Sequence, residues 1–515
     1  MIDLSGKRVV VVGLARSGEA ACRLLLKQGA FVIGIDQGGE CELGPGLSGL
    51  RRDGVILELG GHRPHSLLAA DLVVVSPGID LREPLFQQVR AAGIPLIGEV
   101  ELAYRCSEAT FIGVTGTNGK STTTTLLGAM LKEAGLSSVV AGNIGTPLCQ
   151  VAPSLPAGEI VVAELFSFQL ETIKEFRPRV GLLLNLAPDH LDRYNWVEDY
   201  YQAKARLFEN QDHMDFAVVN ADDPLVLEAA RKATARKVAF SRSQPLAEGA
   251  YLNDDQLILA LSGRRETICR WNEVKIQGVH NLENALAASL AAALVGASQK
   301  AIRSALVRFE GLEHRLEFVA EIGGVRYIND SKGTNVGAVV RSLESFTVPL
   351  VLIAGGKDKQ SDFSPLVPLV RERVKRLILI GQAAGTLRSQ LEGACPMEET
   401  SSLEEAVRRA AAIASLLALG RNRCRDGVQL QRHQGPGEIW RPIPLFEKAA
   451  SLDGGWSGGD GLGHVPRLPG ISAVRSAVIP GLVSALAPGP APVSWSQGER
   501  RTTVAPPIRD LFSTL

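Results

Sequence analysis

Residues 113–121, with the sequence GVTGTNGKS, combine three glycines with a lysine and a serine that could bind a nucleotide phosphate. The stretch departs from the common pattern GxxxxGK[ST], because Val114 stands where the first glycine is expected. The physical requirement is still met, since the other glycines let backbone N–H groups turn toward phosphate oxygens and Lys120 reaches the outer phosphates. Ser121 offers a hydroxyl to Mg²⁺. We therefore predict a nucleotide-binding loop, followed by a helix whose positive end faces the same anion; a glycine-rich turn without a ligand is the weaker alternative.

Four further polar clusters each follow an apolar stretch of strand length. Glu164 ends one such stretch, and residues 185–193 contain a histidine, two aspartates and an arginine. Residues 329–335 hold an acid, a lysine and two hydroxyls, and residues 355–359 are rich in glycine and lysine. Alone, Glu164 is more often a solvated or capping residue, residues 185–193 are equally well explained as a capping turn, and each of the other two stays open as a polar βα loop. Because the carboxyl ends of parallel strands meet at one edge of a sheet, four together favour a site where acids hold Mg²⁺ and lysines neutralise phosphate.

The elements that must position these loops have the pattern of α/β units. Residues 8–12 are a β-branched run typical of a buried strand, and residues 13–18 make a glycine-containing turn into a helix. A second strand over 31–35 ends at Asp36, and a third covers 72–75. This order is typical of a dinucleotide-binding fold, with a phosphate at a helix N-terminus and a carboxylate for a ribose. The glycines do not fit GxGxxG, so a plain α/β turn stays open as the alternative.

Two more α/β units follow the first. One starts with a strand over 111–114 that leads into the glycine-rich loop, and the other with a strand over 325–328. Strands alternate with helices, which predicts parallel sheets covered on both faces. After about Ser415 no strand or helix period is visible, and about a third of residues 451–500 are Gly or Pro, which is typical of a flexible tail. The predicted α/β fold has a Rossmann-like N-terminal domain (1–108), a central P-loop ATPase-type parallel sheet (109–312), an incomplete Rossmann-like C-terminal domain (313–415) and a disordered tail (416–515).

Composition limits the class of protein and its partners. Lys plus Arg and Asp plus Glu both number 55 in 515 residues, so no net field draws the chain to nucleic acid or to an anionic membrane. The 7 cysteines lack CxxC spacing, which argues against a disulfide framework or a structural zinc site. The N-terminus lacks a signal-peptide pattern, and the longest apolar helix, 285–297, is shorter than the roughly 20 residues that span a bilayer. We expect a soluble, cytoplasmic monomer without membrane insertion.

Six short motifs occur in a fixed order along residues 1–410. They are Gly116-Thr117-Asn118-Gly119-Lys120-Ser121, Glu164 with Ser167-Phe168-Gln169-Leu170-Glu171, Asp189-His190-Leu191-Asp192-Arg193, His280-Asn281-Leu282-Glu283-Asn284-Ala285, His314-Arg315 and Asn329-Asp330-Ser331-Lys332. Together they resemble the Mur ligase family. The resemblance implies a three-domain, ATP-dependent and Mg²⁺-dependent ligase of peptidoglycan precursor synthesis, and so a role in cell-wall biogenesis, cell shape and cell division.

Five further motifs narrow the resemblance. They lie at 13–18 (GLARSG), 76–79 (SPGI), 98–102 (GEVEL), 141–145 (AGNIG) and 355–359 (GGKDK). They resemble the members of the family that add D-glutamate to UDP-N-acetylmuramoyl-L-alanine. The Asp-Asn-Pro-Arg signature of members that add a diamino acid is not found, and folylpolyglutamate synthases lack this N-terminal domain. Another Mur-type amino-acid ligase remains the alternative within enzymes.

The resemblance implies a mechanism in which ATP phosphorylates the alanyl carboxylate and the amine of D-glutamate then displaces phosphate. Two Mg²⁺ ions and lysines would offset the crowded negative charge. Catalytic roles fall to Lys120, Glu164, His190, Lys204 and Lys332. ATP would be bound by Gly116, Thr117, Asn118, Gly119, Lys120, Ser121, Thr122, Asn281, Asn284, Arg315 and Asp330. The metal ligands would be Ser121, Glu164, His190 and Lys204. The UDP-sugar precursor would be bound by Arg16, Ser17, Asp36, Gly78 and Asn143, and the acyl phosphate and D-glutamate by Lys332, Thr334 and Lys359.

Lys204 owes its assignment to the resemblance alone, because its position is one that the family carbamylates. A carbamate turns a cation into an anionic oxygen ligand, which Mg²⁺ favours. From the residues by themselves, Lys204 would be interpreted as an exposed lysine on a helix.

The sequence departs from the family pattern at three places. Phe166 stands where the family has serine, and Gln37-Gly38 replaces a hydroxyl and a basic residue after Asp36. After Ser415 nothing matches the family's last strand, which ends in Leu-Ser-Pro, or the following turn with a phenylalanine. Our hypothesis is a shift of the coding frame near Ser415. A nucleotide-binding protein left inactive by this ending is therefore the alternative from a different class.

Overall fold

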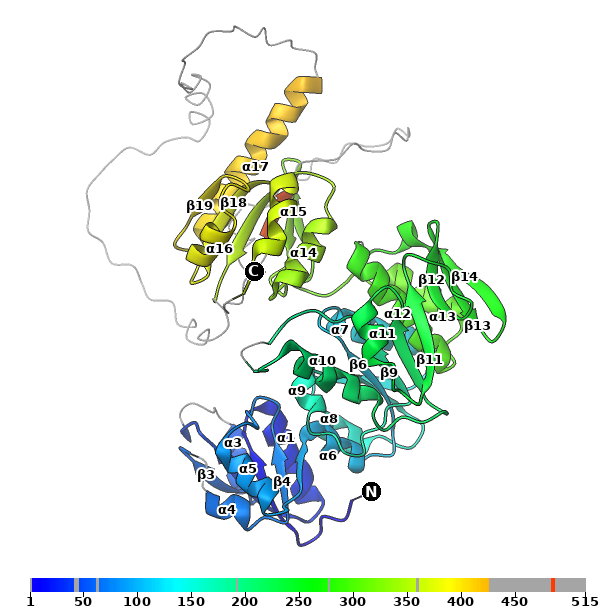
Figure 1. Cartoon of the computed structure of the whole chain (residues 1–515), viewed down its shortest axis with the longest axis vertical. Coiled ribbons are helices and arrows are strands. Elements are labelled where there is room, and N and C mark those ends of the chain that lie inside the picture. Colours follow the sequence, from blue (N-terminus) through cyan, green and yellow to red (C-terminus); the bar gives the residue numbers. More distant parts are fainter. Residues whose placement is uncertain are drawn as a thin grey trace, which may run out of the picture.

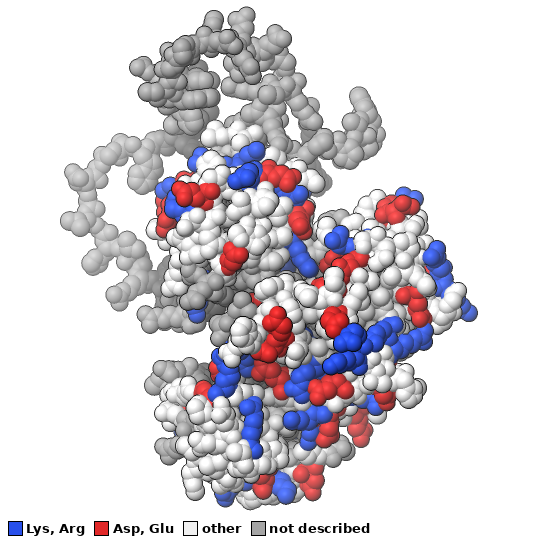
Figure 2. All heavy atoms as spheres, in the orientation of Figure 1, with Lys and Arg blue, Asp and Glu red and all other residues white. Residues whose placement is uncertain are grey.

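The computed structural model describes residues 2–40, 46–61, 64–190, 193–276, 278–357, 361–425 and 483–486. These residues form three units, each built around its own β-sheet (Figure 1). The N-terminal and C-terminal units lie at opposite ends of the view, with the central unit between them. Acidic and basic side chains are interspersed on the face shown in Figure 2, in keeping with their equal numbers in the sequence. None of the helices in the described part of the chain is long and apolar enough to cross a membrane.

The N-terminal sheet has five parallel strands. They are β1 (Arg8–Val12), β2 (Phe31–Asp36), β3 (Ile56–Leu59), β4 (Leu72–Val75) and β5 (Leu96–Gly98), in the order β3-β2-β1-β4-β5. The helices are α1 (Arg16–Lys27), α3 (Gly46–Arg52), α4 (Pro64–Leu68), α5 (Pro84–Ala91) and α6 (Glu99–Arg105). The four valines of β1 are fully buried, because alternate side chains belong to two different cores: Val9 and Val11 pack with α1, and Val10 and Val12 with α4 and α5. The predicted buried strand is confirmed.

The central sheet has nine strands in the order β14-β13-β12-β11-β10-β9-β6-β8-β7. They are β6 (Thr110–Thr115), β7 (Ser138–Gly142), β8 (Ile160–Glu164), β9 (Val180–Leu183), β10 (Phe216–Asn220), β11 (Arg236–Ser241), β12 (Gly249–Asn253), β13 (Gln256–Leu261) and β14 (Arg264–Arg270). The helices are α7 (Lys120–Glu133), α8 (Leu148–Val151), α9 (Ser167–Leu170), α10 (Val197–Ala205), α11 (Pro224–Ala229), α12 (Val279–Leu294) and α13 (Gln299–Arg308), with short 3₁₀ turns η1 (Ala152–Ser154), η2 (Arg206–Phe208) and η3 (Trp271–Glu273). Helix α12 is buried over most of its length, because it packs against both α7 and the sheet.

The last three strands of the central sheet differ from the predicted parallel arrangement. β12, β13 and β14 form an antiparallel meander. Two-residue turns join them, and Asp254 and Ser262 adopt the left-handed conformation, with φ of 54° and 51°. Such turns suit the twist of a hairpin. Asn253-Asp254-Asp255 and Ser262-Gly263 are the turn signals in the sequence that indicate these hairpins.

The C-terminal sheet has six strands in the order β15-β16-β20-β17-β18-β19. They are β15 (Glu317–Ile322), β16 (Val325–Asn329), β17 (Leu350–Gly355), β18 (Val374–Ile380), β19 (Met397–Glu399) and β20 (Val483–Leu486). The helices are α14 (Val336–Glu344), α15 (Val367–Arg373), α16 (Ala384–Gln390) and α17 (Leu403–Arg425), with the 3₁₀ turn η4 (Ser364–Leu366). Helices α14 to α16 cover one face, and α17 covers the other with Ala406, Val407, Ala410 and Ala414.

The region after Ser415 departs from the predicted unstructured tail at two places. Helix α17 continues to Arg425 because residues 416–419 are three leucines and one alanine, which favour helix. Strand β20 pairs antiparallel with both β16 and β17. The physical reason is that two strand edges facing each other inside a sheet need hydrogen-bond partners. The rest of 416–515 lies outside the described residues, and the domain boundaries at 108, 312 and 415 stay predictions.

Candidate active site

The glycine-rich loop lies between β6 and α7 and has a shape that requires glycine at two positions. Gly116 and Gly119 have φ values of 151° and 84°. A side chain at position 119 would place its Cβ 2.1 Å from Asn284 Oδ1. Asn185, which follows β9, holds the loop from the other side: its Oδ1 accepts a hydrogen bond from the Asn118 amide at 2.8 Å, and its Nδ2 donates to Asn118 O at 3.1 Å. Asn185 and the two glycines therefore define the conformation of the loop.

Two buried lysines share one carbonyl oxygen of this loop. Lys120 Nζ donates to Gly116 O at 2.9 Å and to Thr117 O at 2.8 Å, and Lys204 Nζ donates to Gly116 O at 2.9 Å. Burial lowers the pKa of Lys120 to about 8, although the nearby Glu164 carboxylate opposes the shift. Burial, with the adjacent Lys120 charge, lowers the pKa of Lys204 well below its usual value. Lys204 is 0% exposed, so the interpretation as a surface lysine is wrong.

Glu164, at the end of β8, is the acid best placed for a cation. It is buried, and its Oε2 has no hydrogen-bond partner among the described residues. A buried carboxylate oxygen without a partner is costly unless a cation reaches it. Ser121, at the start of α7, offers a hydroxyl oxygen that in this structure accepts from Arg315 at 3.1 Å. These oxygen ligands fit Mg²⁺.

The structure does not gather three or more His, Cys, Asp or Glu side chains into a metal-binding group within the described ranges. A magnesium site here would therefore use the Glu164 carboxylate together with hydroxyl oxygens, phosphate oxygens or water. His190, with φ of 55°, lies on the loop after β9, and its Nε2 is 4.0 Å from Asp189 Oδ2. The complete set of four predicted metal ligands stays a prediction.

Half of the predicted site residues line one cavity of about 720 Å³ between the central and C-terminal units. It is bounded by the glycine-rich loop, the ends of β7 and β8, the 189–190 turn and the segments 311–315 and 332–335. The predicted residues that line it are Thr117, Asn118, Gly119, Lys120, Ser121, Asn143, Glu164, His190, Arg315, Lys332 and Thr334. A neighbouring cavity of about 50 Å³ contains Thr122, Asn281, Asn284 and Asp330 and shares Asn118, Gly119 and Arg315 with the first.

The C-terminal unit contributes buried polar groups to these cavities. Asp330 accepts hydrogen bonds from the Leu316 amide at 3.1 Å and from Ser342 Oγ at 2.5 Å, and burial raises its pKa to about 6. Asn335, which the sequence analysis did not single out, donates from Nδ2 to Asn118 Oδ1 at 3.2 Å and to Asp189 Oδ2 at 2.9 Å. The contact joins two units far apart in sequence, so no local pattern could have revealed it.

Tyr200 is a second residue that the sequence analysis missed. Its hydroxyl lies 3.3 Å from Thr117 Oγ1, and the Lys204 ammonium lies 4.7 Å from its ring centroid. Tyr200 and Lys204 are four residues apart on α10, a spacing that places them on the same face of a helix. This spacing was the feature of the sequence that could have indicated Tyr200 as a neighbour of Lys204.

The predicted precursor-binding residues lie mainly at the carboxyl edge of the N-terminal sheet. Asp36 ends β2 and stabilises two turns. Its Oδ2 accepts from the amide of Leu14, in the turn between β1 and α1, at 2.6 Å, and its Oδ1 accepts from the Gly38 amide at 2.8 Å. Ser17 lies in the first turn of α1, and Gly78 follows β4. Their roles, like those of all predicted site residues, stay predictions. Lys359 lies outside the described residues.

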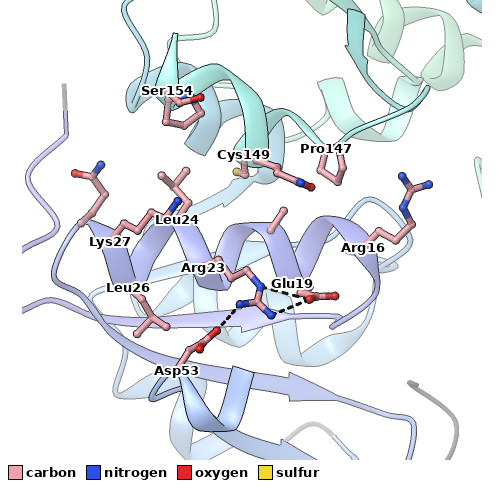
Figure 3. Close-up of a pocket in the computed structure, with 14 residues that line it drawn as sticks. Arg16, Glu19, Arg23, Leu24, Leu26, Lys27, Asp53, Pro147, Cys149 and Ser154 are labelled. Carbon is pink, nitrogen blue, oxygen red and sulfur yellow. Dashed lines mark hydrogen bonds and ion pairs between the residues drawn. The ribbon is translucent and has the colours of Figure 1, made fainter. Parts of the chain in front are cut away.

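A groove of about 850 Å³ separates α1 from α8 and η1. Figure 3 shows Arg23 between Glu19 and Asp53 on one side, and Pro147, Cys149 and Ser154 on the other. Although larger than the cavity at the glycine-rich loop, it contains a single predicted site residue, Arg16, whose guanidinium donates to Gly145 O. The size of a cavity alone would therefore misplace the chemistry, which depends on the buried charges near the loop.

Comparison with known proteins agrees with this architecture. Family models match residues 7–98 (Mur ligase MurD-like, N-terminal domain), 114–292 (Mur ligase middle domain) and 314–418 (Mur ligase, glutamate ligase domain). The chain belongs to the Mur ligase family.

Among curated relatives, the chain is similar to enzymes named UDP-N-acetylmuramoylalanine–D-glutamate ligase. It is 46% identical to that of Pelotomaculum thermopropionicum, over 87% of this chain and 99% of the relative, and 45% identical to that of Geotalea daltonii, over 79% and 89%. Among solved structures, MurF from Acinetobacter baumannii has a TM-score of 0.52 at 15% identity, covering 81% of this chain and 86% of that one. A pseudomurein peptide ligase type C from Methanothermus fervidus has a TM-score of 0.51 at 20% identity, covering 79% and 94%. These two show the fold.

Proposed function

We propose that the protein is an ATP-dependent ligase that joins D-glutamate to UDP-N-acetylmuramoyl-L-alanine, releasing ADP and phosphate, in the cytoplasmic synthesis of peptidoglycan precursors. The observation that carries the proposal is the convergence of Lys120, Glu164, Arg315 and Lys332 on one cavity at the glycine-rich loop. Identity above 40% to relatives that bear this name supports the choice of amino acid. The position of these residues at the glycine-rich loop supports a role in binding and transferring phosphate.

We assign different residues to each of two chemical steps. Lys120, the loop amides and the N-terminus of α7 bind the phosphates of ATP. The alanyl carboxylate attacks the terminal phosphorus, the bond to ADP breaks, and an acyl phosphate forms. The amine of D-glutamate then attacks the carbonyl carbon, loses a proton and expels phosphate. Lys332, Thr334 and Lys359 are proposed for this second step, in which positive side chains stabilise charge that develops on oxygen.

Mg²⁺ is the metal cofactor that the family requires, and it would supply charge neutralisation at the phosphates. We propose two sites, with Ser121 and Glu164 at the first, and His190 and a carbamate of Lys204 at the second. The unpartnered Oε2 of Glu164 supports the first. The lowered pKa of Lys204 supports the second, because only the neutral amine of a lysine adds to carbon dioxide, releasing a proton as the carbamate forms.

The proposal is tested by incubating the full-length protein with ATP, Mg²⁺, UDP-N-acetylmuramoyl-L-alanine and single amino acids. We expect phosphate release with D-glutamate and none with L-lysine, and mass spectrometry should show the new amide. Lys120→Ala is the matched control and should abolish release while the protein stays folded by circular dichroism. Release with L-lysine but not with D-glutamate would replace the proposed substrate.

The altered ending favours one second candidate, a nucleotide-binding protein without turnover. The C-terminal family model stops at residue 418, close to the place where we propose that the coding frame shifts. Tight binding of ATP with no D-glutamate-dependent release would support this candidate. Resequencing the gene tests the frame shift, which an intact family-like ending in the same frame would refute. We also propose that the protein is a monomer, which light scattering on the purified protein checks.

A further inference from the structure

The aromatic ring of Phe166 lies among the charged side chains of the candidate active site. Phe166 follows Glu164 and Leu165 at the end of β8, lies partly buried, and lines the same cavity as Lys120. The Lys120 ammonium lies 4.5 Å from the centroid of the Phe166 ring. We propose that Phe166 is a positioning residue that holds the Lys120 ammonium toward the phosphates of a nucleotide. This inference rests on the proposed function only in that Lys120 binds a nucleotide phosphate.

The contacts of Lys120 explain why a ring matters here. An ammonium has three protons, and two hydrogen bonds go to the carbonyl oxygens of Gly116 and Thr117. The face of an aromatic ring carries negative partial charge and attracts a cation without fixing the direction of its N–H bonds. When the protons of Lys120 turn from the carbonyls toward a phosphate, the ring is therefore a contact that the lysine can keep. A serine hydroxyl at position 166 would instead compete as a directional partner.

The ring of Phe166 is itself held in place from three directions. The backbone N–H of Phe166 donates to Gln169 Oε1 at 2.9 Å, which fixes the start of α9. Its ring stacks on Phe168, with centroids 5.2 Å apart and planes at 23°, and meets the edge of His190 at 6.1 Å and 81°. Geometries of this kind stabilise aromatic pairs. The Lys120 ammonium therefore lies against a ring whose orientation its neighbours define.

Binding of ADP and AMP to the full-length protein separates this role from simple packing, because AMP lacks the β-phosphate that Lys120 reaches. Isothermal titration calorimetry is carried out on the wild type, Phe166→Leu, Phe166→Tyr and the neighbouring control Phe168→Leu. Leucine keeps apolar volume without the aromatic face, whereas tyrosine keeps the face. We expect Phe166→Leu to weaken ADP about 3- to 30-fold and AMP less than about twofold, and Phe166→Tyr to restore ADP affinity. Phe168 stacks on the Phe166 ring, so Phe168→Leu perturbs the support of that ring but keeps the aromatic face against Lys120, and it should weaken ADP binding less than Phe166→Leu does.

The inference is overturned if Phe166→Leu binds ADP as tightly as the wild type, or if ADP and AMP weaken equally, since both results leave the ring a packing role. It is supported if the loss is confined to ADP and tyrosine reverses it. Wild-type protein that binds no adenine nucleotide would overturn both this inference and the proposed function. Normal ADP binding with the predicted variant pattern, but no ligase turnover with D-glutamate, would overturn the proposed function alone.

Discussion

At Glu164 the chain buries a carboxylate oxygen that no described residue satisfies, and next to it two lysines make hydrogen bonds only to carbonyl oxygens. Such charges are costly in a protein interior when ions of opposite charge do not bind to them. Phosphates and Mg²⁺ are the ligands that would balance these charges.

Glu164→Gln should largely abolish the effect of Mg²⁺ on nucleotide binding. A neutral amide keeps the volume of the side chain but is a poor ligand for a hard cation. We therefore expect the factor by which Mg²⁺ raises ADP affinity to be smaller in the variant than in the wild type, on the order of tenfold. Calorimetric titrations of ADP with Mg²⁺ and with a chelator measure this. The metal-free variant should melt no lower than the wild type, because an uncompensated charge is removed. Undiminished enhancement by Mg²⁺ would show that the metal binds elsewhere.

Glu99 should make the stability of the protein depend on pH. Its Oε1 accepts from the Cys149 amide at 2.7 Å, and burial raises its pKa to about 7. Because the folded pKa lies above that of the unfolded chain, the stabilising contribution is complete below about pH 4.5 and is lost as the pH rises through 7. From pH 5 to pH 8 the free energy of unfolding should fall by about 2–3 kcal/mol through this group.

Glu99→Gln keeps an acceptor for the Cys149 amide and should flatten this slope, which denaturant unfolding between pH 5 and pH 8 can measure. Glu108→Gln, at an exposed position after α6, is the control and should leave the slope unchanged. Equal slopes in the wild type and Glu99→Gln would mean that other groups cause the pH dependence.

At the scale of elements, buried strands were predicted well where their apolar runs are long. β1, β6 and β8 show such runs, and each is followed by a polar or glycine-rich turn. The hairpins of β12 to β14 differ from the prediction, because their two-residue turns join antiparallel strands where helical crossovers between parallel strands were expected. The position of β20 could not be predicted, because it depends on the facing edges of β16 and β17 rather than on any local signal.

Strand β20 gives a prediction about the C-terminal unit. A chain that ends after Arg425 loses β20 and leaves the facing edges of β16 and β17 unpaired. We expect its C-terminal unit to lose about 2–6 kcal/mol of unfolding free energy, from a few backbone hydrogen bonds, and to aggregate more readily. Differential scanning calorimetry provides the comparison. A chain that ends after Leu486 keeps β20 and is the control; equal melting of both would show that β20 does not stabilise the sheet.

At the scale of the whole molecule, the site lies where two units meet. Arg315 reaches Ser121, and Asn335 reaches both Asn118 and Asp189. Asn335 also caps α14, since its Oδ1 accepts from the Ala338 amide at 2.8 Å. One side chain therefore ends a helix of the C-terminal unit and joins that unit to the nucleotide loop.

Asn335→Ser should separate these two roles, because serine caps a helix about as well as asparagine but is too short to bridge the units. We expect a change in unfolding free energy below about 0.5 kcal/mol and a loss in kcat/KM of roughly tenfold, the worth of one hydrogen bond to a charged group. Phosphate release and denaturant unfolding measure the two effects. Asn335→Ala removes the cap as well and should cost about 1 kcal/mol more. Full activity of the serine variant would show that the bridge is dispensable.

The sequence by itself determined the α/β fold, the glycine-rich loop and the residue types of the site, because apolar periodicity and glycine spacing are local properties of the chain. The resemblance to a family added Lys204, which no local pattern distinguishes. Only the tertiary structure decided that Lys204 is buried beside Lys120, that Asn335 joins two units, and that Phe166 lies against an ammonium. These depend on contacts between residues distant in sequence, and their free energy comes from burial and neighbouring charge, which exist only once the sheets have packed.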